Sequence, residues 1–328
     1  MQLRIFTEPQ QGASYQTLLA VARMAEECGF DGFFRSDHYL ADTKFPTGGP
    51  GGLPGPSDAW ITLAGLAVQT SRLRLGTLMT AATFRHPGPL AIEVAGVDEM
   101  SAGRVELGLG TGWFEAEHHA YGIPFPGLGE RFDRLEEQLR VITGLWETPP
   151  GQSFSFSGRH YQIADSPALP KPVQAPRPPV IVGGKGPRRT PWLAAHYADE
   201  YNIAYADRES AAAQFSRLRE ACLAAGRDPQ SLRMSATLLT CCGQTNRDLS
   251  QRAQAIGQDL GELRETGLAG SPAEVLDAIG KWAEIGTSRL YLSMLDLSDL
   301  DHLALISQQV MPGVEQRGRG DRPGAWAK

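Results

Sequence analysis

The chain has 328 residues, a length that suits one large α/β barrel or two ordinary domains. Hydrophobic residues make up 41% of it and charged residues 21%, a composition that excludes an intrinsically disordered chain. The net charge is −6, from 31 basic and 37 acidic side chains, which argues against nucleic acid or an anionic membrane as the main partner.

Cysteine usage and the N-terminus indicate a reducing compartment. The four cysteines form no C-x-x-C pair, and the adjacent residues Cys241 and Cys242 are poorly placed for a disulfide, so we expect reduced thiols. Residues 1–9 lack the basic and apolar regions of a signal peptide. No stretch approaches the roughly 20 apolar residues of a membrane span. We therefore expect a cytoplasmic protein.

Short apolar segments alternate with helical patterns along the chain. Eight such alternations predict an α/β fold of the (β/α)8 TIM-barrel type. A doubly wound sheet would also alternate, but it would more naturally carry a Gly-x-Gly-x-x-Gly turn after the first strand, where this chain reads Thr7-Glu8-Pro9-Gln10-Gln11-Gly12. The predicted strands are Leu3–Phe6, Gly32–Ser36, Leu73–Met79, Arg104–Gly108, Pro179–Gly183, Glu200–Ala204, Leu232–Thr240 and Ser288–Met294.

Helices are predicted between these strands. Ser14 is a candidate N-cap for a helix that ends before Gly29. Apolar residues from Phe132 to Trp146 recur at steps of three and four, as on one face of a helix. Ser271 and Glu274 form a predicted capping box. We expect one domain over residues 1–314 and a flexible tail over 315–328.

Two insertions interrupt the alternation, after strands two and four. In residues 46–56, nine of eleven positions are Gly or Pro, so the segment forms neither helix nor sheet. A lid over the active site and a passive insertion are both compatible with this composition. The second insertion, from Thr148 to Pro178, is rich in Pro and is predicted to be irregular.

Polar residues follow the predicted strands at the barrel end where active sites are built. Asp37 and His38 follow the second strand, and a neutral imidazole there could exchange a proton near pH 7. A histidine that closes a loop by hydrogen bonding is the alternative. A longer polar run follows the fourth strand and contains Thr111, Gly112, Trp113, Glu115, Glu117 and His118.

The fifth strand is followed by a glycine-rich turn, Gly183-Gly184-Lys185-Gly186, and then by Arg188 and Arg189. Glycines let the backbone approach an anion, and the start of a helix leaves N–H groups unpaired. The turn is therefore a candidate phosphate site, with a simple tight turn as the alternative. No metal site is expected, because the first strand lacks the His-x-His pair typical of barrel hydrolases.

Several longer segments together resemble a known family. They include Ser36-Asp37-His38, Thr83-Phe84-Arg85-His86-Pro87, Ser101-Ala102-Gly103-Arg104, Gly108-Leu109-Gly110-Thr111-Gly112-Trp113, Leu128-Gly129-Glu130-Arg131-Phe132 and Pro179-Val180-Ile181-Val182-Gly183-Gly184. From about Leu3 to Pro312 the chain resembles the bacterial luciferase superfamily of luciferase-like flavin and deazaflavin oxidoreductases. Within that superfamily it is most similar to the branch that depends on coenzyme F420, with FMN as the alternative cofactor.

The resemblance implies a site at the barrel mouth. The deazaflavin ring would rest on a bulge at Leu78-Met79 that contains a non-prolyl cis peptide. The implied cofactor contacts are Asp37, Leu78, Met79, Gly110, Thr111, Gly112, Tyr121, Gly183, Gly184, Lys185 and Gly186. His38, Glu117 and His118 are the implied catalytic residues, and Trp113 and Glu115 the substrate pocket. A helix-opening acid and a capping residue are the alternative roles for Glu117 and His118.

The resemblance also implies an activity, hydride transfer between coenzyme F420 and a small organic substrate. The alternatives are an FMNH2-dependent monooxygenase and, in a different class, a non-catalytic flavin-binding paralogue. Sugar-phosphate dehydrogenases of the F420 group carry a Trp shortly after the histidine and a Glu after the Thr-Gly turn, where this chain has Asp42 and Trp113. The departure argues against sugar-phosphate oxidation. A homodimer is expected, as in many such relatives.

Overall fold

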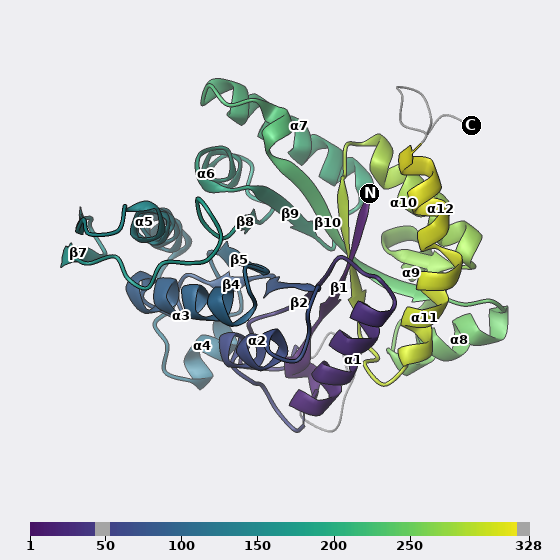
Figure 1. Cartoon of the computed structure of the whole chain (residues 1–328). Helices are drawn as coiled ribbons and strands as arrows, with labels where there is room; N and C mark the ends of the chain where they lie inside the picture. The colour runs from purple at the N-terminus through teal and green to yellow at the C-terminus, as the bar shows by residue number, and fades with distance from the viewer. Residues whose placement is uncertain (43–52, 320–328) are drawn as a thin grey trace.

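The protein is a closed barrel of eight parallel strands surrounded by helices. The computed structural model describes residues 1–42 and 53–319. Strand β12 pairs with both β1 and β10, which closes the barrel (Figure 1). The predicted fold and all eight predicted strands are confirmed. The barrel strands are β1 (Gln2–Thr7), β2 (Gly32–Arg35), β3 (Arg74–Thr77), β5 (Val105–Gly110), β8 (Val180–Gly183), β9 (Glu200–Ala204), β10 (Arg233–Cys242) and β12 (Arg289–Met294).

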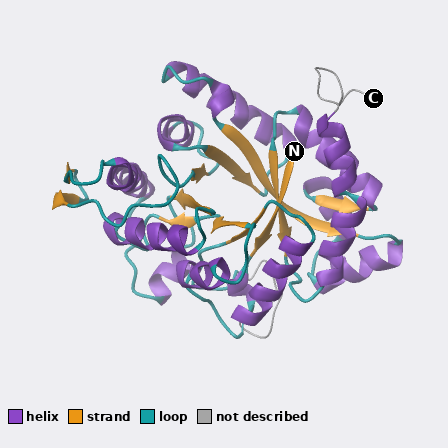
Figure 2. Cartoon of the chain, in the orientation of Figure 1, coloured by secondary structure: helices purple, strands orange, loops and turns teal. Residues whose placement is uncertain are grey.

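Helices cover the outside of the barrel (Figure 2). The Ser14 hydroxyl accepts a hydrogen bond from Thr17 N at the start of α1, and Ser271 and Glu274 form a reciprocal capping box at the start of α10, as the sequence predicts. The helices are α1 (Tyr15–Glu27), α2 (Ala59–Ala67), α3 (Pro87–Met100), α4 (Glu115–Ala120), α5 (Leu128–Glu147), α6 (Arg189–Tyr197), α7 (Arg208–Ala224), α8 (Asn246–Ala255), α9 (Leu260–Thr266), α10 (Pro272–Glu284), α11 (Leu300–Gln309) and α12 (Met311–Arg319).

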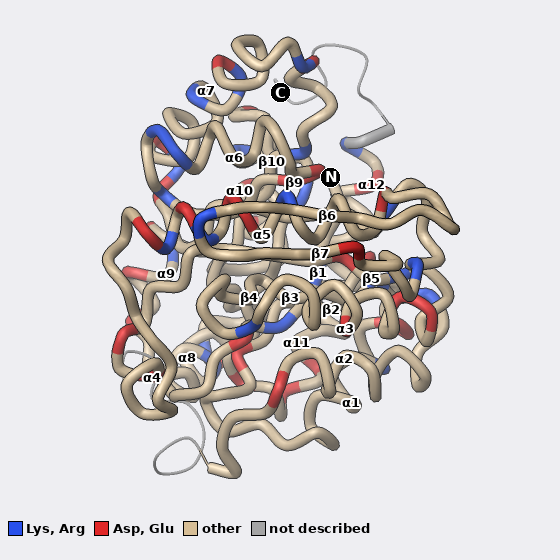
Figure 3. Tube along the Cα trace, turned by 90° about the vertical axis from the view of Figure 1, so that its left-hand side faces the viewer, with Lys and Arg blue, Asp and Glu red and all other residues tan. Residues whose placement is uncertain are grey.

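The insertion after the fourth barrel strand contains an antiparallel hairpin, β6 (Phe154–Ser157) with β7 (Gln162–Ser166), and in this respect the prediction of an irregular segment was wrong. In β6 the phenylalanines are half-buried and the serines exposed, because one face of this strand packs against α5. The hairpin projects beyond α5 in Figure 1 and crosses the near side in Figure 3. Two short strands, β4 (Thr80–Ala81) and β11 (Leu268–Gly270), extend the sheet beside β5 and β10.

The last helix differs from the expected tail. Helix α12 continues to Arg319, so residues 315–319 are helical where a flexible tail was predicted. Residues 320–328 lie outside the described part of the chain, and so do residues 46–52 of the Gly/Pro-rich insertion.

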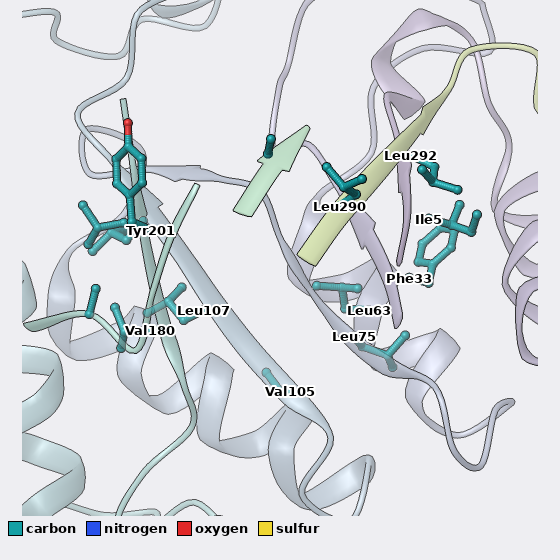
Figure 4. Packing of buried hydrophobic residues seen from close by; sticks show 14 of the residues in the cluster. Ile5, Phe33, Leu63, Leu75, Val105, Leu107, Val180, Tyr201, Leu290 and Leu292 are labelled. Atoms are coloured by element: carbon teal, nitrogen blue, oxygen red, sulfur yellow. The ribbon is translucent and has the colours of Figure 1, made fainter. Parts of the chain in front are cut away.

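Side chains alternate along each barrel strand between the helices and the barrel interior. Outward-facing residues such as Ile5, Phe33, Leu75 and Leu290 are buried against the helices and form the main hydrophobic core (Figure 4). A second, smaller cluster lies inside the barrel and consists of Phe6, Phe34, Leu78, Ile181 and Tyr291.

Charged residues fill the lower end of the barrel interior. Arg4 donates two hydrogen bonds to Glu106, of 2.6 and 2.9 Å, and Arg289 pairs with Glu200. Burial would raise the pKa of Glu106, but the charges and hydrogen bonds of Arg4, with Arg289 and Arg74, outweigh it and hold that pKa well below its usual range. This end of the barrel is therefore closed by paired charges.

Two further features concern membranes and metal ions. In the part of the chain that the structure describes, no helix has the length and apolar character needed to cross a membrane. Nor do the described residues include a group of three or more His, Cys, Asp or Glu side chains suited to holding a metal ion. Acidic and basic residues are interspersed along the trace (Figure 3).

Candidate functional site

A cavity of about 640 Å³ opens at the carboxyl ends of the barrel strands. Its size suits a cofactor-sized ligand. Most of the predicted site residues line it: Asp37, His38, Leu78, Met79, Gly110, Thr111, Gly112, Trp113, Glu117, Gly183, Gly184, Lys185 and Gly186. Glu115, His118 and Tyr121 are not part of this lining.

His38 and Glu117 form a hydrogen-bonded pair in the cavity wall. The Nδ1 atom of His38 lies 2.9 and 3.1 Å from the two carboxylate oxygens of Glu117, and Tyr39 N donates to Oε2 at 2.9 Å. Because a carboxylate only accepts, Nδ1 carries the hydrogen. Among the described residues, His38 Nε2 has no hydrogen-bond partner. In the neutral imidazole this nitrogen is an acceptor.

The pair also shifts the pKa of the His38 imidazole. Burial lowers the pKa of His38, but the hydrogen bond and negative charge of Glu117, with Glu8 and Asp37 further away, outweigh burial and raise it above its ordinary value. The side chain of His38 is 19% exposed and that of Glu117 1%, so Glu117 supports the ring from within.

Asp37 presents an unpaired oxygen. Its Oδ2 accepts hydrogen bonds from Thr80 Oγ1 at 2.9 Å and Arg85 Nη1 at 2.5 Å. Its Oδ1 is buried and has no partner among the described residues, although Asp37 lines the cavity. A buried polar atom without a partner is costly, so Oδ1 is a candidate contact for a ligand donor.

The Leu78–Met79 peptide is cis, as the family resemblance implied. Met79 extends between β5 and β8 and contacts their glycines. A Cβ at Gly110 would lie 2.9 Å from the Met79 sulfur, so the absence of a side chain there makes room for Met79. These residues form one side of the cavity.

The glycine-rich turn forms another side. Tyr201 Oη donates to Gly184 O at 2.6 Å, Gln214 Nε2 donates to Gly186 O at 3.0 Å, and Lys185 Nζ donates to Tyr205 O at 2.8 Å. The Lys185 N–H belongs to the same peptide as the Gly184 carbonyl, and in a trans peptide these two groups point in opposite directions. Tyr201, which holds the carbonyl, packs in the outer core, so the Lys185 N–H faces away from that residue. No side chain caps the start of α6, which follows the turn.

These features make the turn suitable for an anion. Gly184 has φ +130, a conformation that glycine adopts without strain. An uncapped helix start adds unpaired N–H groups and a favourable dipole. Arg189, in contrast, pairs with Asp133 at 2.7 Å and so faces α5.

Aromatic residues form the outer wall. Trp113 and Phe114 stack with ring centroids 5.0 Å apart, and the His38 ring meets Trp113 edge-on at 5.6 Å. Trp113 is 60% exposed, so its ring can contact a ligand at the mouth. Phe132 of α5 lines the same cavity near Gly186.

Three predicted site residues lie elsewhere. His118 is buried behind the wall, where Nδ1 donates to Phe114 O and Nε2 accepts from the Thr83 hydroxyl, each at 2.7 Å. Its ring packs with Phe84 and Phe125. Tyr121 is exposed and contacts Tyr39. Glu115 is exposed to solvent, 3.8 Å from His119.

The structure adds residues that the sequence interpretation missed. Tyr205 Oη donates to Glu8 Oε1 at 2.8 Å, Gln10 Nε2 donates to Glu8 Oε2 at 2.7 Å, and Ser36 donates to Gln10 Oε1 at 2.6 Å. All four residues line the cavity. Glu8 and Tyr205 each follow a barrel strand directly, so the strand-end rule that selected Asp37 could have found them.

Comparisons with known proteins place this site in context. The chain is 36% identical over 186 residues to an F420-dependent glucose-6-phosphate dehydrogenase of Microbacterium testaceum. The match covers 56% of this chain and 51% of that protein. It is 34% identical over 238 residues to an F420-dependent hydroxymycolic acid dehydrogenase of Mycobacterium tuberculosis, covering 69% of this chain and 59% of that one. The matches thus span between half and three fifths of these relatives.

Solved structures share the whole fold. An F420-dependent secondary alcohol dehydrogenase in complex with an F420-acetone adduct superposes with a TM-score of 0.80 at 19% identity, over 95% of this chain and 98% of that one. A long-chain alkane monooxygenase shares the fold with a TM-score of 0.80 at 17% identity, over 97% of this chain and 92% of that one. The oxygenating constituent of 3,6-diketocamphane monooxygenase of Pseudomonas putida, in complex with FMN, shares it with a TM-score of 0.72 at 18% identity, over 95% of this chain and 98% of that one. The luciferase-like monooxygenase family model matches residues 1–262. The chain therefore belongs to the luciferase-like monooxygenase family.

Proposed function

We propose that this protein is an oxidoreductase that moves a hydride between coenzyme F420 and a small organic substrate at the barrel mouth. The observation that carries the proposal is the His38–Glu117 pair, which leaves one imidazole nitrogen for a substrate in a cavity that is also lined by the candidate phosphate turn. The named activities of the F420-dependent relatives support the same assignment.

The residues present fit such a cofactor. The buried Asp37 Oδ1 needs a donor, and the turn at Gly183–Gly186 offers backbone N–H groups to a phosphate. Leu78 and Met79 would lie against the ring, and Gly110, Thr111 and Gly112 beside it. When bound, F420 supplies the hydride acceptor or donor.

The protein's own residues would then handle the proton. For alcohol oxidation, neutral His38 accepts the substrate hydroxyl proton at Nε2, while Glu117 holds Nδ1–H and stabilises the imidazolium that forms. For carbonyl reduction, protonated His38 returns that proton to the oxygen. Trp113 and Phe114 orient the substrate and exclude water from its apolar part.

The lining also indicates the substrate. Lys185 is the one Lys or Arg among the described residues that line the cavity, and it lies in the candidate phosphate turn. Glu8 and Glu117 add carboxylates near His38. We therefore expect an uncharged substrate with an apolar body, and poor activity with sugar phosphates.

Parallel titration with F420 and FMN, followed by fluorescence quenching, tests the proposal. We expect saturable F420 binding, and reduction of bound F420 by an apolar secondary alcohol such as cyclohexanol. Tight FMN binding, with oxygen consumption by the reduced complex that yields an oxygenated substrate rather than hydrogen peroxide alone, would instead establish an FMNH2-dependent monooxygenase. Binding without turnover for alcohol and carbonyl compounds would favour the non-catalytic flavin-binding protein.

A further inference from the structure

A second cavity of about 550 Å³ lies next to the first and shares one residue with it, Lys185. We call it the α7 basin. It lies beyond the glycine-rich turn, on the side of α7, whereas His38 lies in the first cavity. Its described lining consists of Lys185, Ile203, Asp207, Glu209, Ser210, Ala213, Gln214 and Arg217.

Gln214 links the basin to the glycine-rich turn. It is buried, its Nε2 donates to Gly186 O at 3.0 Å, and its Oε1 accepts from Arg217 Nη1 at 3.0 Å. One amide thus holds both the turn and the guanidinium. Arg217 is therefore oriented next to the candidate phosphate site by a fixed contact, although the arginine itself is exposed.

The donors of the basin are incompletely used. Arg217 has five N–H donors, and no ion pair joins it to any described residue. Lys185 uses one of its three ammonium hydrogens on Tyr205 O.

The carboxylates of the basin are differently placed. Asp207 is engaged as the N-cap of α7, accepting from Ser210 N at 2.8 Å and Ser210 Oγ at 2.7 Å, which lowers its pKa. Glu209, in the first turn of α7, is the other carboxylate of this lining and is exposed. The two carboxylates therefore lie in the N-cap and first turn of α7, whereas Arg217 lies further along the helix and bonds Gln214, which contacts Gly186.

We propose that the α7 basin binds a carboxylate-bearing extension of the cofactor that continues past its phosphate. Coenzyme F420 has such an extension, a chain of glutamate residues, whereas FMN ends at its phosphate. Arg217 and Lys185 pair with the tail carboxylates, and Gln214 holds Arg217 toward them. This inference rests on the proposed function, and it adds a binding site outside the catalytic cavity.

Direct binding measured by fluorescence tests the inference without any turnover. The probes are F420 with several glutamates and F420-0, which keeps the phosphate and its lactyl carboxylate but lacks the glutamates, so that their difference reports the glutamate carboxylates alone. At low ionic strength the unaltered protein should bind the glutamylated form at least about twofold more tightly, as expected for exposed charge pairs. Arg217→Glu should weaken binding of the glutamylated form by about fivefold or more and leave F420-0 nearly unchanged.

Two further results separate the possible explanations. Arg219→Gln, on the same helix but bonded to Ile285 O, is the matched control and should alter neither affinity. Equal affinities of the unaltered protein for both probes, or equal losses for both probes in Arg217→Glu, would overturn the α7 basin as a tail site while leaving F420 binding intact. Failure of both probes to bind the unaltered protein would overturn the proposed function as well.

Discussion

His38 and Glu117 lie 79 positions apart in the chain, yet Nδ1 of the histidine is within 3.1 Å of both carboxylate oxygens of the glutamate. One residue follows β2 and the other lies on α4, after β5. The barrel brings these two strand ends to the same mouth. The pair fixes which imidazole nitrogen a substrate meets, and the following predictions start from it.

His38→Ala should retain cofactor affinity within a few-fold and lower turnover by at least about 10²-fold, because the proton acceptor is lost. Binding by fluorescence quenching and turnover at saturating cofactor should be measured on the same variant. A loop-closing histidine would give the opposite pattern, with weaker binding or stability and normal turnover of the bound fraction.

Glu117→Gln should shift the pH dependence of turnover. Glu117 raises the pKa of His38, so removing its charge should lower that pKa. Alcohol oxidation needs the neutral imidazole, and its acid limb should therefore move to lower pH in the variant. Glu115→Gln, on the exposed face of the same helix, is the control and should leave the profile unchanged. An unshifted acid limb in Glu117→Gln would show that His38 does not control the rate.

Gly184→Asp should weaken cofactor binding by tenfold or more, about 1.4 kcal/mol, because its carboxylate would face the phosphate. Gly184 has φ +130, so any side chain strains the backbone there. Gly184→Ala carries the same strain without the charge and is the control. Equal affinities of the folded Asp and Ala variants would remove this turn from the phosphate site.

The paired charges inside the barrel should be important for stability. Glu106→Gln removes the carboxylate that Arg4, Arg74 and Arg289 share. Asp31 and Glu200 then remain as the only carboxylates of this cluster among the described residues, so it keeps one uncompensated buried positive charge, and we expect a loss of about 3–5 kcal/mol in the free energy of unfolding. Because the pKa of Glu106 is lowered, its contribution is present above the unfolded pKa and lost as pH falls through the folded pKa, in strong acid. Glu130→Gln, which breaks the exposed pair with Arg134, should cost less than about 1 kcal/mol. Urea unfolding of both variants measures the difference.

A homodimer remains a prediction, and the outer faces of α2 and α3 are where we expect it to form. These helices pack side by side, and Ile61 and Ile92 are 77% and 53% exposed. Exposed apolar residues grouped on neighbouring helices are typical of subunit interfaces. Ile61→Glu should lower the sedimentation coefficient to that of a monomer, while Leu223→Glu on α7 should not. A monomeric unaltered protein would contradict the prediction.

The sequence predicted the barrel well because its signals are local. Apolar runs such as Pro179–Gly183 mark strands, and each cap, such as Ser14, acts within one turn. The strand-end rule then selected Asp37 and His38. The β6–β7 hairpin was missed although Phe154 and Phe156 alternate with serines, since the surrounding prolines outweighed that pattern.

The sequence could not show which residues of the polar segment after the fourth barrel strand face the cavity. Glu115 and Glu117 are two residues apart, and in a helix this places them on nearly opposite faces. Which face meets the cavity depends on how α4 packs, and the sequence alone does not determine that. Glu117 therefore reaches His38, while Glu115 points to solvent and His118 to the aromatic cluster.

The closed lower end of the barrel has a kinetic consequence. The interior beneath Phe34 and Tyr291 is filled by charged side chains, those of Arg4, Glu106, Arg289 and Glu200. Ligands therefore enter from the strand-end mouth. In the proposed arrangement the cofactor ring would lie on Leu78, which is buried, and the substrate would lie beside Trp113, which is exposed and nearer the opening. This arrangement favours an ordered mechanism. The cofactor binds before the substrate, and the product leaves before the cofactor.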